Sequence, residues 1–129
     1  VVDYVQLMRE RDARAGDKKT ATELALAGLC DLARRENMAV LLLSQLSREC
    51  ERRDNKRPLL SDLRETGELE QAADAVLFLY RDEVYDPSSR DKGIAECLVA
   101  KNKHGKTGIL RLQWDGPTAS LRPLVERMA

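Results

Sequence analysis

Polar groups that could act on a phosphate stand at the ends of apolar runs in this chain. Two such runs, 40–43 and 75–80, bracket a charged loop that is too polar to be core. In open α/β sheets, ligands bind at the carboxyl ends of parallel strands. An amide, a guanidinium and a glycine backbone at such positions can sense a phosphate or hold a polyanion. The residues concerned are Gln45, Arg64, Glu65 and Gly67.

The first residues, 1–4, are an apolar run that carries a carboxylate, Asp3, near its end. In nucleotide-binding α/β proteins, an Asp at such a strand end holds Mg²⁺, directly or through water. Asp also often begins a turn, so Asp3 alone leaves both interpretations open. Three strand ends that carry Asp3, Gln45 and the Arg64 loop, in that order, favour the Mg²⁺ ligand over the turn residue. We expect the contact of Asp3 with Mg²⁺ to run through water.

The order of several short segments resembles that of a known family. The segments are Val2–Met8, Leu43–Arg48, Asp62–Gly67, Leu79–Tyr85, Lys92–Glu96, Lys101–Gly108 and Leu112–Gly116. Together they resemble the C-terminal part of the RecA-like motor domain of a DnaB-type replicative DNA helicase. The resemblance covers almost the whole chain and is weak only over 9–22 and after Gly116. It implies an α/β fold: part of a RecA-like P-loop NTPase core, with a mostly parallel sheet, helices on both faces and a C-terminal β-hairpin.

The pattern along the chain predicts the elements of that fold. We expect strands over 1–4, 38–44 and 75–80, a helix over Ala21–Asn37, and a hairpin with arms Ile94–Ala100 and Ile109–Trp114. The helix follows from apolar residues at helical spacing, and the hairpin from a glycine-flanked polar tip. We expect residues 1–116 to be the carboxyl-side segment of the ATPase domain and 117–129 to be a tail.

No Gly-x-x-x-x-Gly-Lys-Ser/Thr phosphate loop occurs in the 129 residues. The chain also begins inside an expected strand. We therefore expect the phosphate-loop part of the domain to lie upstream in a longer protein, and the fragment alone to be inactive.

The resemblance assigns a role to each candidate residue. It implies that Gln45 senses the γ-phosphate and couples hydrolysis to the DNA loops, whereas a satisfied structural amide is the alternative. An amide at the end of a buried strand costs free energy unless it is hydrogen-bonded. It also implies that Arg64, Glu65 and Gly67 meet the backbone of single-stranded DNA. The alternative for these three is a solvated charged turn.

Lys101 and Lys103 occupy the positions from which, in this family, the hairpin reaches the neighbouring subunit's γ-phosphate. The family usually has Arg where this chain has Lys103. A lysine ammonium is a point charge and lacks the bidentate fork of a guanidinium, so it would be the weaker group. A register shifted by one residue, or simply a basic hairpin tip, is the alternative. The resemblance thus implies that Gln45, Lys101 and Lys103 are catalytic, and that these three and Asp3 contact ATP.

Composition limits the surfaces that can bind nucleic acid. Lys and Arg together number 22, as do Asp and Glu, so the formal net charge is zero. A general basic field is therefore absent, and DNA binding would need local loops or a surface shared by subunits. Three cysteines without CxxC spacing favour a reduced, cytosolic chain with no zinc site. No apolar run is long enough to span a bilayer.

The function implied by the resemblance is that of a segment of a hexameric ATP-dependent replicative DNA helicase. Such an enzyme hydrolyses ATP with Mg²⁺, translocates on single-stranded DNA and unwinds duplex at the replication fork. The implied partners are identical subunits in a ring, primase and a helicase loader, in the cytoplasm. Two alternatives stay open: another RecA-like ATPase of DNA recombination or repair, and a non-catalytic split fragment that docks on helicase rings.

Overall fold

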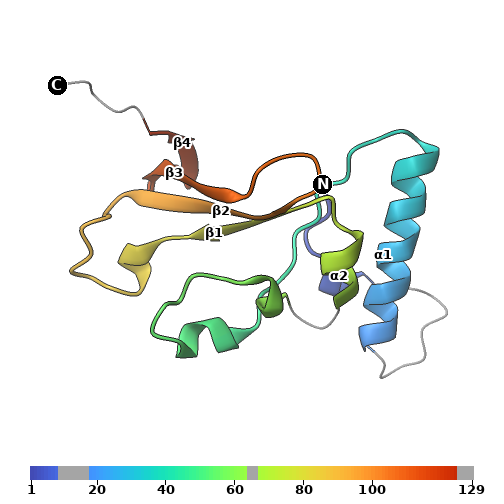
Figure 1. The fold of residues 1–129 in the computed structure, drawn as a ribbon, viewed down its shortest axis with the longest axis horizontal. Helices are drawn as coiled ribbons and strands as arrows, with labels where there is room; N and C mark the ends of the chain where they lie inside the picture. The colour runs from blue at the N-terminus through green and yellow to red at the C-terminus, as the bar shows by residue number, and fades with distance from the viewer. Residues whose placement is uncertain (9–17, 64–66, 125–129) are drawn as a thin grey trace. The chain divides into compact units, whose positions relative to one another are not determined.

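The computed structural model describes residues 1–8, 18–63 and 67–124. These residues form two compact units, Val1–Ala73 and Asp74–Ala129. The two α-helices belong to the first unit and the four-stranded sheet to the second (Figure 1).

The first unit is built on helix α1, Lys18–Arg35, against which the short helix α2, Gly67–Ala72, packs (Figure 1). The expected helix over Ala21–Asn37 is therefore confirmed, with its ends shifted by two or three residues towards the N-terminus. Arg34 and Arg35 lie in its last turn, where cations favour the negative end of the helix dipole. The remaining elements of this unit are the 3-10 turns η1 (Val5–Leu7), η2 (Arg48–Arg52) and η3 (Leu60–Asp62).

The core of the first unit gathers one residue from each of three elements. Val5 from η1, Leu26 from α1 and Leu69 from α2 are buried against one another. Partly buried apolar residues extend this cluster, namely Cys30, Leu42 and Ala72. The core therefore ties the segment that follows Asp3 to both helices.

The expectation of a mostly parallel sheet is wrong, because the four-stranded sheet of this structure is antiparallel. Residues 1–4 and 38–44 meet in one isolated parallel bridge, between Val2 and Leu42, and form no longer strands. A continuous apolar run becomes a buried parallel strand only where neighbours complete the ladder and cover both faces. Here Leu41 and Leu43 stay 57% and 42% exposed, so the apolar run lacks that cover.

The second unit is a four-stranded antiparallel sheet in which each strand pairs with the next along the chain (Figure 1). The strands are β1 (Ala75–Tyr80), β2 (Ile94–Asn102), β3 (Gly108–Asp115) and β4 (Ser120–Pro123). The expected hairpin is confirmed as β2 and β3, and the expected strand over 75–80 as β1. Side chains of β1 alternate, with Phe78 and Tyr80 buried and Leu77 and Leu79 exposed. The expected tail after residue 116 contributes β4, and the domain boundary at 116 stays a prediction.

The connection between β1 and β2 is held by a compact polar cluster. Arg81 donates two hydrogen bonds to Glu83, and its guanidinium lies 4.4 Å from the ring centre of Trp114. Glu83 also accepts a hydrogen bond of 2.9 Å from the backbone N–H of Gly93. Gly93 has a positive φ of 70°, a conformation that favours glycine, and it leads directly into β2.

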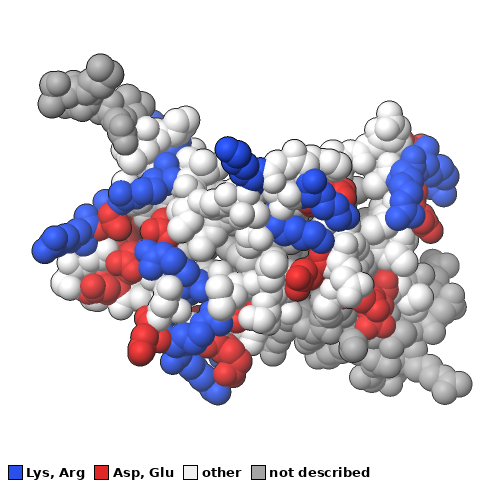
Figure 2. Space-filling model, viewed as in Figure 1, with Lys and Arg blue, Asp and Glu red and all other residues white. Residues whose placement is uncertain are grey.

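Charges of both signs are interspersed over the face of the molecule drawn in Figure 2. This face carries no broad basic field, in keeping with the zero net charge of the sequence. Among the residues that the structure describes, no helix has the length and apolar character needed to cross a membrane.

Candidate functional site

Three backbone hydrogen bonds align the segment of Asp3 with the segment that leads to Gln45. The N–H of Val2 donates to the carbonyl of Leu41, and the N–H of Leu43 donates to the carbonyl of Val2, both at 2.9 Å. The N–H of Val5 then donates to the carbonyl of Leu43 at 3.0 Å. Asp3 follows the bridged Val2, and its side chain is exposed. The carboxylate is therefore available to a ligand and is not part of the core.

Gln45 is also exposed, so the expected cost of a buried amide does not arise. Its backbone N–H donates to Oε1 of Gln6 at 3.3 Å. The amide nitrogen of the same Gln6 donates to Oγ of Ser44 at 2.9 Å. One side chain from η1 thus contacts two consecutive residues of the distant segment, and it connects the Asp3 side of the site with the Gln45 side.

Gln6 was not among the residues that sequence reasoning selected. Its signal was weak: a polar residue between Val5 and Leu7, in a segment otherwise rich in apolar side chains. Periodicity could not reveal its role, because its partners lie 38 and 39 positions away.

The metal expected at Asp3 can be tested against the side chains around it. Within the described residues, no cluster of three or more His, Cys, Asp or Glu side chains could hold a metal ion. A dedicated metal cage is therefore not the arrangement found there. Mg²⁺ in nucleotide sites is typically held by one or two carboxylates, the phosphates and water. A single exposed carboxylate such as Asp3 fits that arrangement.

Of the proposed DNA-binding residues, only Gly67 can be placed, because Arg64 and Glu65 lie outside the described residues. Gly67 is exposed and begins α2. Among the described residues beyond its chain neighbours and the backbone of α2, a Cβ added at this position would meet no atom within 4 Å. Packing within the chain therefore does not require a glycine there, and a close approach of DNA to the backbone stays a prediction.

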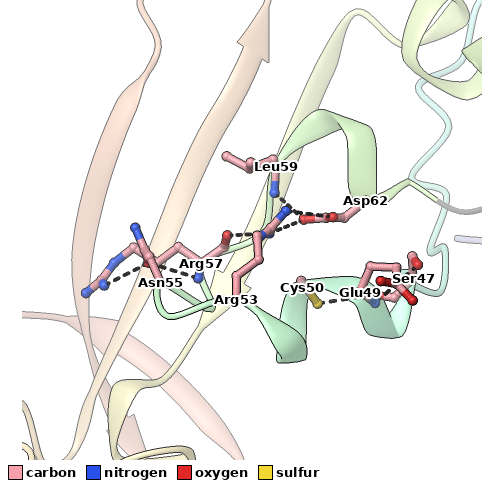
Figure 3. A network of polar contacts seen from close by, with 8 residues as sticks. All are labelled: Ser47, Glu49, Cys50, Arg53, Asn55, Arg57, Leu59 and Asp62. Carbon is pink, nitrogen blue, oxygen red and sulfur yellow. Dashed lines mark hydrogen bonds and ion pairs between the residues drawn. The ribbon is translucent and has the colours of Figure 1, made fainter.

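The segment before the Arg64 loop is organised by a buried carboxylate, Asp62 (Figure 3). Its two oxygens accept hydrogen bonds from Nη1 and Nη2 of Arg53, at 3.1 and 2.6 Å. Oδ2 also accepts from the backbone N–H of Leu59 at 2.8 Å. The guanidinium of Arg53 in turn donates to the carbonyl of Arg57 at 3.1 Å. These bonds fold residues 53–62 onto themselves without regular secondary structure beyond one 3-10 turn.

Burial and hydrogen bonding act in opposite directions on the carboxyl of Asp62. Burial, the larger single effect, raises the pKa, whereas the hydrogen bonds from Arg53 and Leu59 and the charge of Arg53 lower it. The combined result is a pKa below the ordinary value, so the ionised form is favoured. The same pairing raises the pKa of the Arg53 guanidinium, chiefly through the hydrogen bond to Asp62. The sequence had indicated only a charged loop here.

The two lysines of the expected trans site lie at the end of β2. Lys101 is in the strand, opposite Val76 of β1, and is half-buried. Lys103 follows the strand, and its Nζ lies 2.9 Å from Oδ1 of Asp74. The hydrogen bond from Lys103, followed by its charge, holds the pKa of the Asp74 carboxyl below its ordinary value. The basic tip therefore carries a carboxylate partner that sequence reasoning missed.

The structure thus groups the expected residues into two sets. Asp3 and Gln45 belong to the first unit and share the contacts of Gln6 and the parallel bridge. Lys101 and Lys103 belong to the second unit and share the neighbourhood of Asp74.

Comparisons of the sequence and of the structure with known proteins both find DnaB-like helicases. A family model described as the DnaB-like helicase C-terminal domain matches residues 1–122. The chain is 43% identical over 129 residues to the replicative DNA helicase DnaB of Haemophilus influenzae. It is 41% identical over 112 residues to that of Geobacillus stearothermophilus. These alignments cover 98% and 87% of this chain but 27% and 25% of the relatives, so the chain spans about a quarter of their length.

Two solved structures are also similar. A DnaB-like replicative helicase, studied together with its interactions with primase, matches with a TM-score of 0.88 and 41% identity. That match covers 95% of this chain and 29% of the solved one. A solved ATPase domain matches with a TM-score of 0.88 and 40% identity, over 95% of this chain and 43% of that chain. The fold is thus that of part of a RecA-like helicase ATPase domain, and the chain belongs to the family of DnaB-like helicase C-terminal domains.

Proposed function

We propose that this chain is the carboxyl-side segment of the motor domain of a hexameric, ATP-dependent replicative DNA helicase. The complete protein hydrolyses ATP with Mg²⁺ at subunit interfaces, translocates on single-stranded DNA and unwinds the duplex at the replication fork. The single observation that carries this proposal is the family match over residues 1–122, supported by relatives that are named replicative helicases. The phosphate loop that such a motor needs would come from a part of the protein outside these 129 residues.

In this proposal the exposed carboxylate of Asp3 anchors Mg²⁺ on the bound nucleotide, through water. The metal supplies positive charge that neutralises the phosphates. Gln45 senses the γ-phosphate: its amide can both donate and accept hydrogen bonds, so it can exchange partners between nucleotide states. Support comes from the exposure of both side chains and from the Gln6 contacts that hold their segments together.

Lys101 and Lys103 would act in trans, on the nucleotide of the neighbouring subunit. Lys101 lies near the end of β2 and Lys103 directly follows that strand, so both stand close to the β2–β3 turn, where a cation could meet a group of a neighbouring subunit. A cation delivered in this way stabilises charge on the transferred phosphoryl group and is worth about 10³ to 10⁵ in rate when it is Arg. We assign Lys103 the weaker version of that role, because an ammonium cannot form the bidentate fork.

Single-stranded DNA would contact Arg64, Glu65 and Gly67, through a guanidinium and backbone amides that hold phosphates without reading sequence. The proposed protein partners are identical subunits, a helicase loader and primase. The primase proposal is supported by the structural neighbour that was studied with primase. A motor that works on replicating DNA places the protein in the cytoplasm.

The test uses the full-length protein and two single substitutions, Asp3→Ala and Lys103→Ala. Each variant ring should lose ATP hydrolysis, by about 10³-fold for the trans cation. Binding of a fluorescent ATP analogue to single subunits should weaken in Asp3→Ala when Mg²⁺ is present, and should be unchanged in Lys103→Ala. Lys106→Ala, which removes another exposed lysine of the same hairpin tip, is the matched control and should retain full activity.

Mixing the two inactive variants tests whether Lys103 acts on the nucleotide of the neighbouring subunit. A mixed ring contains some interfaces at which Asp3 of one subunit and Lys103 of its neighbour are both intact, so part of the activity should return. If no activity returns on mixing, or if Lys103→Ala hydrolyses ATP normally, Lys103 does not act in trans. If the full-length protein shows no DNA-stimulated ATP hydrolysis at all, the helicase proposal itself is wrong.

A further inference from the structure

The tip of the β2–β3 hairpin is tied to the residue that precedes β1. The backbone N–H of Lys103 donates to the carbonyl of Asp74 at 2.8 Å, and Nζ of Lys103 lies 2.9 Å from Oδ1 of Asp74. The ladder explains why they meet, because Ala75 pairs with Asn102 and the next residues outwards are Asp74 and Lys103. Two contacts of different kinds therefore join the same two residues.

Asp74 also interacts with a second cation, Lys101. The hydrogen bond and the charge of Lys103 favour the ionised form of Asp74 most, and the charge of Lys101 adds a smaller effect that lowers its pKa in the same direction. A carboxylate among these cations is unexpected in a site that should bind a phosphate, since it repels the anion and competes for the ammonium.

We propose that Asp74 is the resting partner of Lys103, which must leave this carboxylate before its ammonium can reach the neighbouring subunit's γ-phosphate. The inference rests on the proposed trans role of Lys103 and adds a residue to it. Asp74 acts chiefly through Lys103 and is not assigned a contact with the nucleotide, so it is a positioning residue. The backbone hydrogen bond keeps the tip in place while the side chain changes partner.

The exposure of the pair makes such an exchange feasible. The side chains of Lys103 and Asp74 are 43% and 73% exposed, so water screens their attraction strongly. Exposed ion pairs of this kind shift an equilibrium by no more than about five-fold. A γ-phosphate with its larger negative charge can therefore displace the carboxylate, and the carboxylate can recapture the ammonium after hydrolysis.

The experiment replaces Asp74 with Asn in the full-length ring. Asn has nearly the same shape, removes the charge and leaves the backbone carbonyl that accepts from Lys103. With saturating single-stranded DNA, kcat for ATP hydrolysis should rise about two- to five-fold, with KM for ATP unchanged. The matched control is Asp91→Asn, which removes another exposed carboxylate paired with a cation of the same sheet, Arg111. Its kcat should not change.

A double-substitution cycle separates Asp74 from a general effect on the tip. In a Lys103→Met background, Asp74→Asn should have a much smaller effect on kcat, because the main partner of Asp74 has been removed and its weaker interaction with Lys101 remains. A fall in kcat in Asp74→Asn, or an equal effect with and without Lys103, would overturn this inference and leave the helicase proposal standing. A wild-type ring without ATP hydrolysis would overturn both, so the two failures are distinguishable.

Discussion

Replacing Arg53 with Met should destabilise the first unit, and the loss of stability should be larger at neutral pH than at acidic pH. The side chain of Asp62 is 4% exposed and accepts three hydrogen bonds, two of which come from Arg53. Without Arg53, the bond from the N–H of Leu59 is the one of these three that the carboxylate keeps within the described part of the chain. Removing one partner of a buried ion pair costs about 3 to 5 kcal/mol. Because the Arg53 side chain is itself 33% exposed, we expect the lower end for the stranded carboxylate, about 3 kcal/mol at neutral pH.

The pH dependence follows from the two opposing effects on Asp62. In the native chain its pKa is lowered, so the ionised carboxylate contributes stability that is present above about pH 3.9, the unfolded value, and is lost as pH falls through the folded value. In Arg53→Met, burial dominates and the folded pKa rises above the unfolded value. At neutral pH the buried, ionised Asp62 then lowers the free energy of unfolding of the variant, and this loss disappears as pH falls through the raised pKa. The difference in the free energy of unfolding between the native chain and Arg53→Met should therefore become smaller on acidification.

Urea unfolding, followed by the helical circular dichroism signal, can measure both effects. The α-helices found in the described part of the chain, α1 and α2, belong to the first unit, so this signal reports mainly on the unit that contains Asp62. With a slope of about 1 to 1.5 kcal/mol per M, the midpoint of Arg53→Met should fall by about 2 to 3 M urea near pH 7, and by less near pH 4.5. Arg52→Met is the control, since Arg52 pairs with Glu49 at 3.0 Å in an exposed position and should show almost no loss. Equal midpoints for the two variants, or a difference from the native chain that does not narrow on acidification, would refute the reasoning.

Three further predictions concern activity. The 129-residue chain alone should not hydrolyse ATP, because it has no phosphate-loop motif; a phosphate-release assay that detects Mg²⁺-dependent turnover would contradict this. In the full-length protein, Gln6→Met should reduce the stimulation of ATP hydrolysis by single-stranded DNA, since it removes both contacts to the Gln45 segment. Gln6→Glu should retain the stimulation, because its carboxylate can accept from the N–H of Gln45 and from the Ser44 hydroxyl; equal loss in both variants would argue against this contact. Arg64→Ala should weaken binding of single-stranded DNA equally for all sequences, and the slope of the logarithm of the binding constant against the logarithm of salt concentration should fall by about one. Fluorescence anisotropy at several salt concentrations would measure this slope, and an unchanged slope would show that Arg64 is a solvated turn residue without a phosphate contact.

Local patterns predicted the local elements of this chain well. The helical spacing around Leu26 and Cys30 predicted α1, and the glycine-flanked polar tip predicted the hairpin of β2 and β3. Both patterns depend on residues that are close in sequence, so the sequence alone carries the information. The alternating exposure of β1 was not visible, because an apolar run of six residues does not indicate which of its side chains will be covered.

Contacts between distant residues could not be predicted in the same way. Gln6 contacts Ser44 and Gln45 only because the parallel bridge aligns their segments, and Asp74 meets Lys103 only because of the register of β1 against β2. The prediction of a parallel sheet was wrong because it too depended on contacts between distant residues. The apolar character of 38–44 indicated burial, but it gave no information on the neighbouring strands that a parallel ladder needs. Candidate residues could thus be named from the family resemblance, whereas the side chains that position them required the structure.

The two outer strands of the antiparallel sheet differ in how easily another strand can add to them. β4 has only four residues, ends at Pro123, which has no backbone N–H to donate, and carries the charged Arg122. Such features discourage edge-to-edge pairing. β1, at the opposite edge, has six residues and exposes Leu77 and Leu79. Within the sheet itself, β1 is therefore the outer strand whose features oppose the addition of a further strand least.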